Sequence, residues 1–222
     1  MSLSVQTKSG SQSTSGNLAV TFSSNVAAGN TIIAIAMDDT SGGLSISDSQ
    51  GNSYTSLYGP NTGTHETSRA WKATAGSSGS LTVTVNAVNP FPVLIIIEYP
   101  ASLGIGAVDQ SSTNSASSGT ALTSGTAVTT TQANELLIAY GGSESNGGTF
   151  TLGGSFAMES QVTAGVGGTC LFVADRAVIS TGSYQATATM SPSQSWFCSL
   201  ITLKISGSVG GGSAQPVVCI MQ

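Results

Sequence analysis

The stretch Phe91-Pro-Val-Leu-Ile-Ile-Ile-Glu-Tyr-Pro100 is the most apolar run of the chain, and it decides the fold class. Val and Ile favour a pleated strand, and a strand without polar alternation is covered on both faces. The prolines at its two ends limit the strand, because proline cannot continue a sheet ladder. We therefore predict a central, fully buried strand over residues 93–99.

Shorter runs with strand-like patterns precede this segment. They are expected at residues 17–22, 31–37, 44–48, 54–57, 68–74 and 81–85, with Gly, Ser and Asn concentrated between them. The turn chemistry at 49–52 predicts that the runs at 44–48 and 54–57 form a hairpin. No stretch has a sustained helical period, so the sequence predicts an all-β fold.

The same order of runs returns in the second half of the chain, displaced by about 105 residues. Ala127-Val-Thr129 repeats Ala19-Val-Thr21, Asn134 to Ala139 repeats Asn30 to Ile35, and 196–205 repeats the opening stretch. Each half has too few strands to cover its own apolar face, so we expect the halves to cover each other.

These patterns predict one domain, residues 1–206, with the fold of a jelly-roll-like antiparallel β-sandwich. It would be built from two pseudo-repeated halves, about 17–100 and 125–205. The Ser/Thr-rich segment 109–126 is predicted to be a long crossover between them.

Residues 207–222 differ from the rest of the chain, because a Gly/Ser linker is followed by the apolar run Pro216-Val-Val-Cys-Ile-Met221. One interpretation is a final strand or a loose end. The other is an arm that adds to the sheet edge of a neighbouring subunit, with Val217, Val218, Ile220 and Met221 as its apolar contacts.

The surface expected from the composition is polar but almost uncharged. Only 7% of the residues are charged, the net charge is -5, and the chain has five basic residues. No nucleic-acid partner is expected, because no positive stripe is available to neutralise phosphates. No membrane insertion is expected either, since no apolar run approaches the ~20 residues that span a bilayer.

The N-terminus of this chain lacks the pattern of a signal peptide. An exported protein whose leader was removed and a virion protein released by lysis both fit this observation. We therefore expect the protein in a virion, or outside the cell at a bacterial surface.

The three cysteines, Cys170, Cys198 and Cys219, form no C-x-x-C pair, so neither a disulfide framework nor a zinc site is indicated. We expect two buried thiols and one thiol in the tail. A bridge between Cys170 and Cys198 stays open as an alternative, since both lie on expected strands of the second half.

A set of short motifs runs through both halves: Ala19-Val-Thr-Phe22, Val26-Ala-Ala-Gly-Asn30, Ser47-Asp-Ser-Gln-Gly-Asn-Ser-Tyr-Thr55, Arg69-Ala-Trp-Lys-Ala73, Glu98-Tyr99, Ala174-Asp-Arg176 and Thr181-Gly-Ser-Tyr184. In these motifs the chain resembles uncharacterised Ser/Thr/Gly-rich β-sandwich modules of bacterial and bacteriophage surface and virion proteins. The resemblance covers residues 3–206 and leaves out the ending 216–222. It implies a surface or tail module without established catalytic residues.

Aromatic side chains near polar loops are the candidates for sugar binding. Trp71, Tyr54 and Tyr58 are placed in this way, and a ring beside hydroxyl and amide groups is a usual platform for a sugar. Packing in the core is the alternative for Trp71, which stands in an expected strand.

Asp38, Asp39 and Asp48 are the densest acidic group in the chain. Oxygen ligands from loops at the end of a sheet are typical of calcium sites, so calcium is the one metal considered, and no other cofactor is expected. No D-x-[DN]-x-[DN]-G loop is present, and the alternative is that these carboxylates accept hydrogen bonds from turn amides.

Catalytic residues are not indicated. His65, the one histidine, lies in a polar loop without a G-x-S-x-G elbow. Glu98 and Asp175 are carboxylates that no spacing pairs. We expect Glu98 to pair with Arg69 or Arg176 or to lie at the rim of the core, and Asp175-Arg176 to act as an ion pair or as a clamp to a loop.

The sequence thus favours a non-enzymatic structural or attachment module of a virion (capsid decoration, fibre or tail) or of a bacterial surface. Its partners would be copies of itself or other surface subunits. A carbohydrate-binding module for surface, plant or bacterial glycans is the alternative, and a hydrolase is the third.

Overall fold

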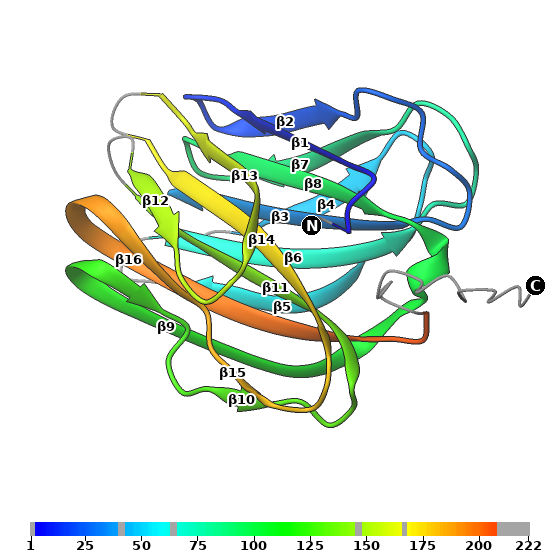
Figure 1. Ribbon diagram of the computed structural model, residues 1–222. Helices are drawn as coiled ribbons and strands as arrows, with labels where there is room; N and C mark the ends of the chain where they lie inside the picture. Colours follow the sequence, from blue (N-terminus) through cyan, green and yellow to red (C-terminus); the bar gives the residue numbers. More distant parts are fainter. Residues whose placement is uncertain (1–2, 40–42, 63–65, 145–147, 166–167, 208–222) are drawn as a thin grey trace, which may run out of the picture.

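The computed structural model describes residues 3–39, 43–62, 66–144, 148–165 and 168–207 (Figure 1). Over these residues the protein is an all-β structure of antiparallel strands with one short 3-10 turn. The first half contains β1 (Gln6–Ser11), β2 (Gly16–Thr21), β3 (Thr31–Asp39), β4 (Ser45–Asp48), β5 (Thr55–Thr62), β6 (Glu66–Thr74), β7 (Thr82–Ala87) and β8 (Val93–Tyr99). After the turn η1 (Ala101–Leu103), the second half contains β9 (Ile105–Thr123), β10 (Val128–Thr129), β11 (Asn134–Ser143), β12 (Thr149–Leu152), β13 (Ala157–Thr163), β14 (Cys170–Ile179), β15 (Ser183–Tyr184) and β16 (Thr187–Ile205).

Two large sheets form the centre of the protein. Their strand orders are β1-β8-β3-β6-β5 and β9-β16-β11-β14-β13. Apolar side chains from both sheets meet in one central core, which includes Ile35, Ile95, Leu136, Tyr140 and Val173. The halves therefore cover each other, as the sequence predicted.

Each large sheet is also covered on its other face. The sheet β2-β7-β4 packs on the first half, and their shared core includes Leu18, Val83 and Ile96. In the second half, β12 and the first part of β16 close a third core that includes Phe150 and Leu200. The expectation of a single core was incomplete, because four layers of strands enclose three cores.

The prediction for the opening stretch is confirmed, since all residues of β8 are buried. Successive side chains of a strand point to opposite faces, so Ile95 enters the central core and Ile96 enters the first-half core. Residues 93–97, which alternate between the two cores, are therefore all apolar, and the first polar residue of the strand is Glu98 near its end. This is the physical reason for the unbroken apolar run.

The segment predicted as a crossover is mostly strand, which corrects that prediction. β9 pairs antiparallel with β16 from Ile105 to Thr123, and the two form the long ribbon at the lower left of Figure 1. Most residues of β9 are exposed or half-buried, because it lies at an edge of its sheet. Its polar composition therefore gave no strand signal. β1 and β13, two other edge strands, were missed for the same reason.

The predicted hairpin over 44–57 is also wrong. β4 pairs with β7, whereas β5 pairs with β6, so the two runs belong to different sheets. The turn chemistry of this region has another use, because Asp48 accepts hydrogen bonds from the backbone N–H groups of Gln50 and Asn52. The turn after β4 therefore connects two strands of different sheets instead of the two strands of a hairpin.

Polar contacts join the two large sheets at both of their edges. The Lys72 ammonium donates to the carbonyl oxygens of Ile105 (3.1 Å) and Gly106 (2.5 Å). At the opposite edge, the hydroxyls of Ser4 and Thr7 donate to the Glu159 carboxylate at 2.7 and 2.6 Å. The two halves are therefore fastened to each other by hydrogen bonds as well as by the central core.

Candidate functional site

A hollow of about 430 Å³ opens where β9, β12 and β16 come together. Three strands build it, because the first part of β16 pairs with β12 on one side and with the end of β9 on the other. The hollow is lined by Ala121, Leu122, Thr123, Thr151, Leu152, Gly153, Gln185, Thr187, Ala188 and Thr189. Its volume lies in the range of about 300–1,000 Å³ that is usual for small-molecule sites.

The register of the three strands explains the shape of the hollow. Thr151, Thr189 and Ala121 form one row across the strands. A second row consists of Gly153, Thr187 and Thr123, with the Gly153 N–H donating to the Thr187 carbonyl oxygen at 2.8 Å. The smallest side chains, Ala121 and Gly153, stand at opposite corners of the two rows. The surface is therefore concave at this place.

Gly153 is required by this close approach. A Cβ atom at position 153 would overlap Oγ1 of Thr187, so a larger residue would displace that threonine. The residues between the threonines, Leu122 and Ala188, are buried in the third core on the opposite face of the strands. The hollow thus has a rigid, paired backbone that is anchored from below by this core.

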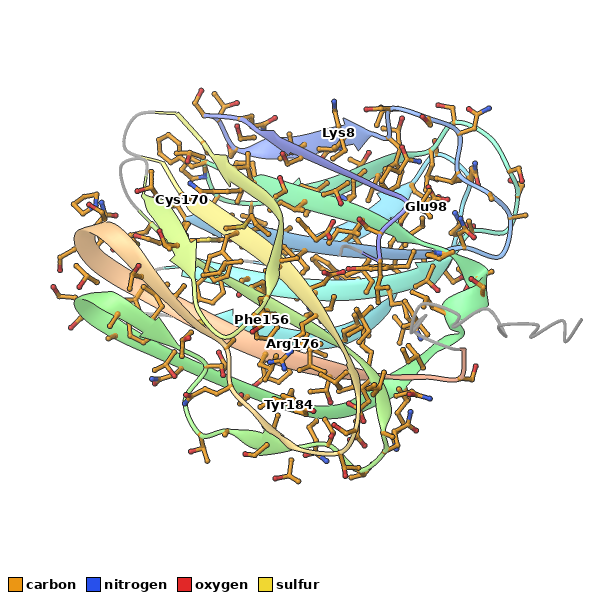
Figure 2. The ribbon with its side chains drawn as sticks, in the orientation of Figure 1. Lys8, Glu98, Phe156, Cys170, Arg176 and Tyr184 are labelled. Carbon is orange, nitrogen blue, oxygen red and sulfur yellow. The ribbon has the colours of Figure 1, made fainter. Side chains whose placement is uncertain are left out.

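No charged side chain lines the hollow. Arg176 lies beside it and is occupied, since it donates to the carbonyl oxygen of Gly154 at 2.9 Å and its guanidinium lies 5.4 Å from the centre of the Tyr184 ring. Figure 2 labels Phe156, Arg176 and Tyr184 in this half of the molecule. The hollow therefore offers hydroxyl, amide and apolar groups to a ligand, without a fixed charge.

The three aromatic residues predicted for sugar binding do not form a common platform. Trp71 is 4% exposed and packs in the first-half core, with the Arg69 guanidinium 5.7 Å from its ring centre. Tyr54 is half-buried against the same core, and its hydroxyl donates to Asp48 at 3.1 Å. Tyr58 packs against the central core instead. The core alternative describes the position of Trp71.

The three aspartates predicted for calcium are not brought together, and the described residues contain no group of three or more possible metal ligands of the His, Cys, Asp or Glu type. Asp48 pairs with Val83 at the start of β7, whereas Asp38 meets Asn89 beyond the end of β7. The length of a strand separates these carboxylates. The four hydrogen bonds that Asp48 accepts from Gln50, Asn52 and Tyr54 match the turn alternative.

Asp38 is fully buried, and burial raises its pKa to about 6. Its Oδ2 accepts a hydrogen bond from the Asn89 side chain at 3.3 Å. Asp39 follows it at the end of β3, where the strand leaves the core. These two residues mark the end of the central strand.

Glu98 pairs with neither arginine, so that prediction is wrong. Its carboxylate accepts hydrogen bonds from the side chains of Gln6 and Asn30, both at 2.6 Å, and from the Ala27 N–H at 3.0 Å. Figure 2 places Glu98 at the end of β8. This carboxylate fastens the loop before β3 to the central sheet, which is a structural role.

Asp175 and Arg176 are neighbours on β14 and therefore point to opposite faces of the sheet. Asp175 is buried and accepts a hydrogen bond from the Tyr99 hydroxyl at 3.1 Å. Burial raises the pKa of Asp175 to about 7, and the nearby Glu159 charge adds to this effect. Arg176 acts as the clamp to a loop, so that alternative is confirmed.

A second pair of acids, which the sequence did not reveal, lies near the start of β11. Glu135 is fully covered, and burial together with the neighbouring Asp109 raises its pKa to about 7. Burial alone would also raise the pKa of Asp109, but hydrogen bonds from Thr131 and the Lys204 ammonium, 3.1 Å away, lower it to about 2. Neither carboxylate lines the hollow between β9, β12 and β16, and the contacts of Asp109 with Thr131 and Lys204 are structural.

Cys170 and Cys198 are buried free thiols, as expected. They lie on β14 and β16, and β11 separates these two strands. A bridge between them would have to span that intervening strand. Burial raises the pKa of Cys198 to about 12.

His65, Cys219 and the predicted arm residues Val217, Val218, Ile220 and Met221 lie outside the described residues. The described part of the chain contains no helix long and apolar enough to cross a membrane. Comparison of the whole chain with protein-family models, with curated proteins and with solved structures finds no match in any of the three.

Proposed function

We propose that the protein is a non-enzymatic structural and attachment module of a virion or of a bacterial surface, which assembles with copies of itself or with other surface subunits. The observation that carries this proposal is the free edge of β2. β2 pairs with β7 on one side only, and its six residues include no charge, no proline and no bulge. Such an edge is a template for another strand.

Two edges of the large sheets, at β5 and at β13, are blunted. The β5 edge contains Pro60 and two shifts of register, and the β13 edge has a bulge between Met158 and Ser160. Bulges and prolines are the usual means by which sheets avoid pairing at their edges. The unprotected β2 edge is therefore the place where we expect a partner strand.

The sequence of the C-terminal arm has suitable chemistry for such a partner strand. Val217, Val218, Ile220 and Met221 follow a Gly/Ser-rich segment in the sequence, and an apolar segment after such a composition suits strand addition to a neighbouring subunit. An arm that reaches the β2 edge of the next copy would form a head-to-tail contact. Contacts of this kind build rings or filaments, which are the assemblies of fibres, tails and decorated shells.

The proposal includes a repeated jelly-roll-like unit. In each half the first strand pairs with the last, and the third strand lies between the last and the sixth. This correspondence supports a pseudo-repeat of one eight-stranded unit. A module made of two similar units can present two similar outer faces to its partners.

Light scattering over a range of concentrations tests the assembly. We expect a mass above that of the 22.0 kDa monomer at high concentration. Deletion of residues 210–222 should restore the monomer, and so should Ala19→Arg, which places a charge on the exposed side of β2. A monomer at every concentration, or an assembly that survives both changes, would contradict the proposal.

Carbohydrate binding is the second candidate function, and the uncharged hollow between β9, β12 and β16 is the observation that favours it. A hydrolase is the third alternative. The lining of the hollow contains no pair of acids and no nucleophile beside a base, so it does not support this alternative.

A further inference from the structure

We propose that the hollow between β9, β12 and β16 is a binding site for a short, neutral oligosaccharide, with Thr123, Thr151, Thr187 and Thr189 as its hydrogen-bonding residues. This inference rests on the second candidate function and is independent of the assembly through β2. None of the four threonines was a sequence-based candidate. They lie on strands whose apolar signal is weak, and only the pairing of β16 with β9 and β12 brings them together.

The first step of the argument is the chemistry of the threonine hydroxyl. A hydroxyl both donates and accepts hydrogen bonds, and so does each hydroxyl of a sugar. The four threonines stand on three adjacent strands, about 4.8 Å apart, and in two rows, about 6.7 Å apart along the strand. This rigid grid presents paired donors and acceptors to a polyhydroxylated ligand.

The second step is the absence of charge. The lining consists of threonine, glutamine, alanine, leucine and glycine. A charged ligand would lose hydration in the hollow without an opposite charge to replace it. A neutral saccharide meets no such cost, whereas nucleotides, acidic sugars and charged peptides do.

The hollow also has apolar surface, which comes from the methyl groups of the threonines and of Ala121. Leu122, Leu152 and Ala188 alternate with these residues, so their side chains pack on the opposite face of the strands, in the third core, and hold the strands in place. A pyranose ring has C–H groups on its faces and hydroxyls around its rim, so it can contact both the methyl groups and the hydroxyls of the threonines. Because the backbone around the hollow is paired, little ordering is needed on binding.

The shape argues against a second copy of the chain as the occupant. The outer face of β2-β7-β4 carries small side chains in register, including Ala19 opposite Thr84 and Thr21 opposite Thr82. A face of small side chains in register is flat, so it would cover the opening of the concave hollow without entering it. An oligosaccharide can enter the hollow, and this difference makes it the expected ligand.

The test uses the full chain on an array of neutral oligosaccharides, composed of glucose, mannose, galactose or xylose, with acidic oligosaccharides printed beside them. We expect binding to one or more neutral classes and none to the acidic ones. The amide signals of residues 121–123, 151–153 and 187–189 should shift in a nuclear magnetic resonance titration with the best neutral oligosaccharide.

Two variants locate the site. Ala121→Arg places a long side chain in the hollow from an exposed position and should weaken binding at least about tenfold. Thr189→Val keeps the shape of an exposed β-branched residue and removes one hydroxyl, so it should weaken binding about threefold to tenfold. Thermal unfolding of both variants should match that of the parent chain.

Ala19→Arg is the matched control, because Ala19 is an exposed strand alanine on the outer face of the other half. It should leave sugar binding unchanged, while Ala121→Arg should leave the assembled mass unchanged. The inference is overturned if no neutral oligosaccharide binds the parent chain, or if Ala19→Arg and Ala121→Arg reduce binding equally. It is also overturned if Ala121→Arg abolishes assembly and leaves sugar binding intact, which would make the hollow an interface between copies.

Discussion

Ile95 and Ile96 allow the cooperativity of the two halves to be measured, because these neighbours on β8 are both fully buried and enter different cores. Replacing either by alanine removes about three buried carbon groups, at ~0.8 kcal/mol each, and leaves a cavity. Each change should therefore lower the free energy of unfolding by about 3–4 kcal/mol. The melting temperature should fall by about 6–16 °C.

The two tryptophans report on the two halves separately, since Trp71 lies in the first-half core and Trp196 in the second-half core. Guanidinium unfolding is followed by fluorescence in a Trp196→Phe background and in a Trp71→Phe background. If the central core makes one cooperative unit, Ile96→Ala lowers the midpoint of both signals equally. Ile95→Ala, which acts in the shared core, should do the same.

The result that refutes this reasoning is a split between the probes. If Ile96→Ala lowers the midpoint of the Trp71 signal and leaves that of Trp196 unchanged, the halves unfold as separate units. The central core would then be a contact between two domains, and the prediction of one domain over residues 1–206 would fail. A loss well below 1 kcal/mol for both variants would instead contradict the packing at β8.

Three further predictions concern buried polar groups and thiols. Glu98→Ala should cost about 2–4 kcal/mol in urea unfolding, because it leaves the Asn30 side chain and other buried donors without an acceptor. Glu98→Gln keeps one acceptor oxygen and should cost less, and equal costs would contradict the explanation by missing acceptors. Burial raises the pKa of Glu135 from 4.5 to about 7, so between these pH values the folded state keeps a proton that the unfolded state has lost. The contribution of Glu135 to the free energy of unfolding therefore falls as the pH rises from about 4.5 to 7. Glu135→Gln should flatten that slope and raise the stability at pH 7.5 by about 1–3 kcal/mol; an unchanged slope would show that Glu135 is ionised throughout. Cys170 and Cys198 should not react with Ellman's reagent in the native state, and both should react in guanidinium. The melting temperature should be the same with and without reductant. Rapid reaction of either thiol in the native state would contradict its burial.

The polar interior has a pattern of its own. Three acids of this chain fasten loops or turns: Glu98 holds the loop before β3, Asp48 holds the turn after β4, and Asp109 holds Thr131. A chain with so few charges thus uses them at positions where one carboxylate can accept several hydrogen bonds. The outer faces are left to neutral side chains, which suits both packing against other subunits and contact with sugars.

The sequence by itself determined the fold class and the central strands. The apolar run of β8, and the corresponding runs of β3, β11 and β16, can be read because burial on both faces leaves few polar residues in the middle of a strand. The pseudo-repeat of the two halves, which the order of apolar runs in the sequence suggested, stays a prediction.

Only the tertiary structure decided the rest. The edge strands β1, β9 and β13 have polar compositions because one or both of their faces contact solvent. Their sequences therefore have no apolar run or alternation from which a strand could be predicted. The burial of Trp71 depends on the sheet that covers it, and the separation of Asp38 from Asp48 depends on the direction of β7. The candidate site has the same origin: four threonines that are ordinary in the sequence become a single surface because β16 is long enough to pair with β9 and β12 at once.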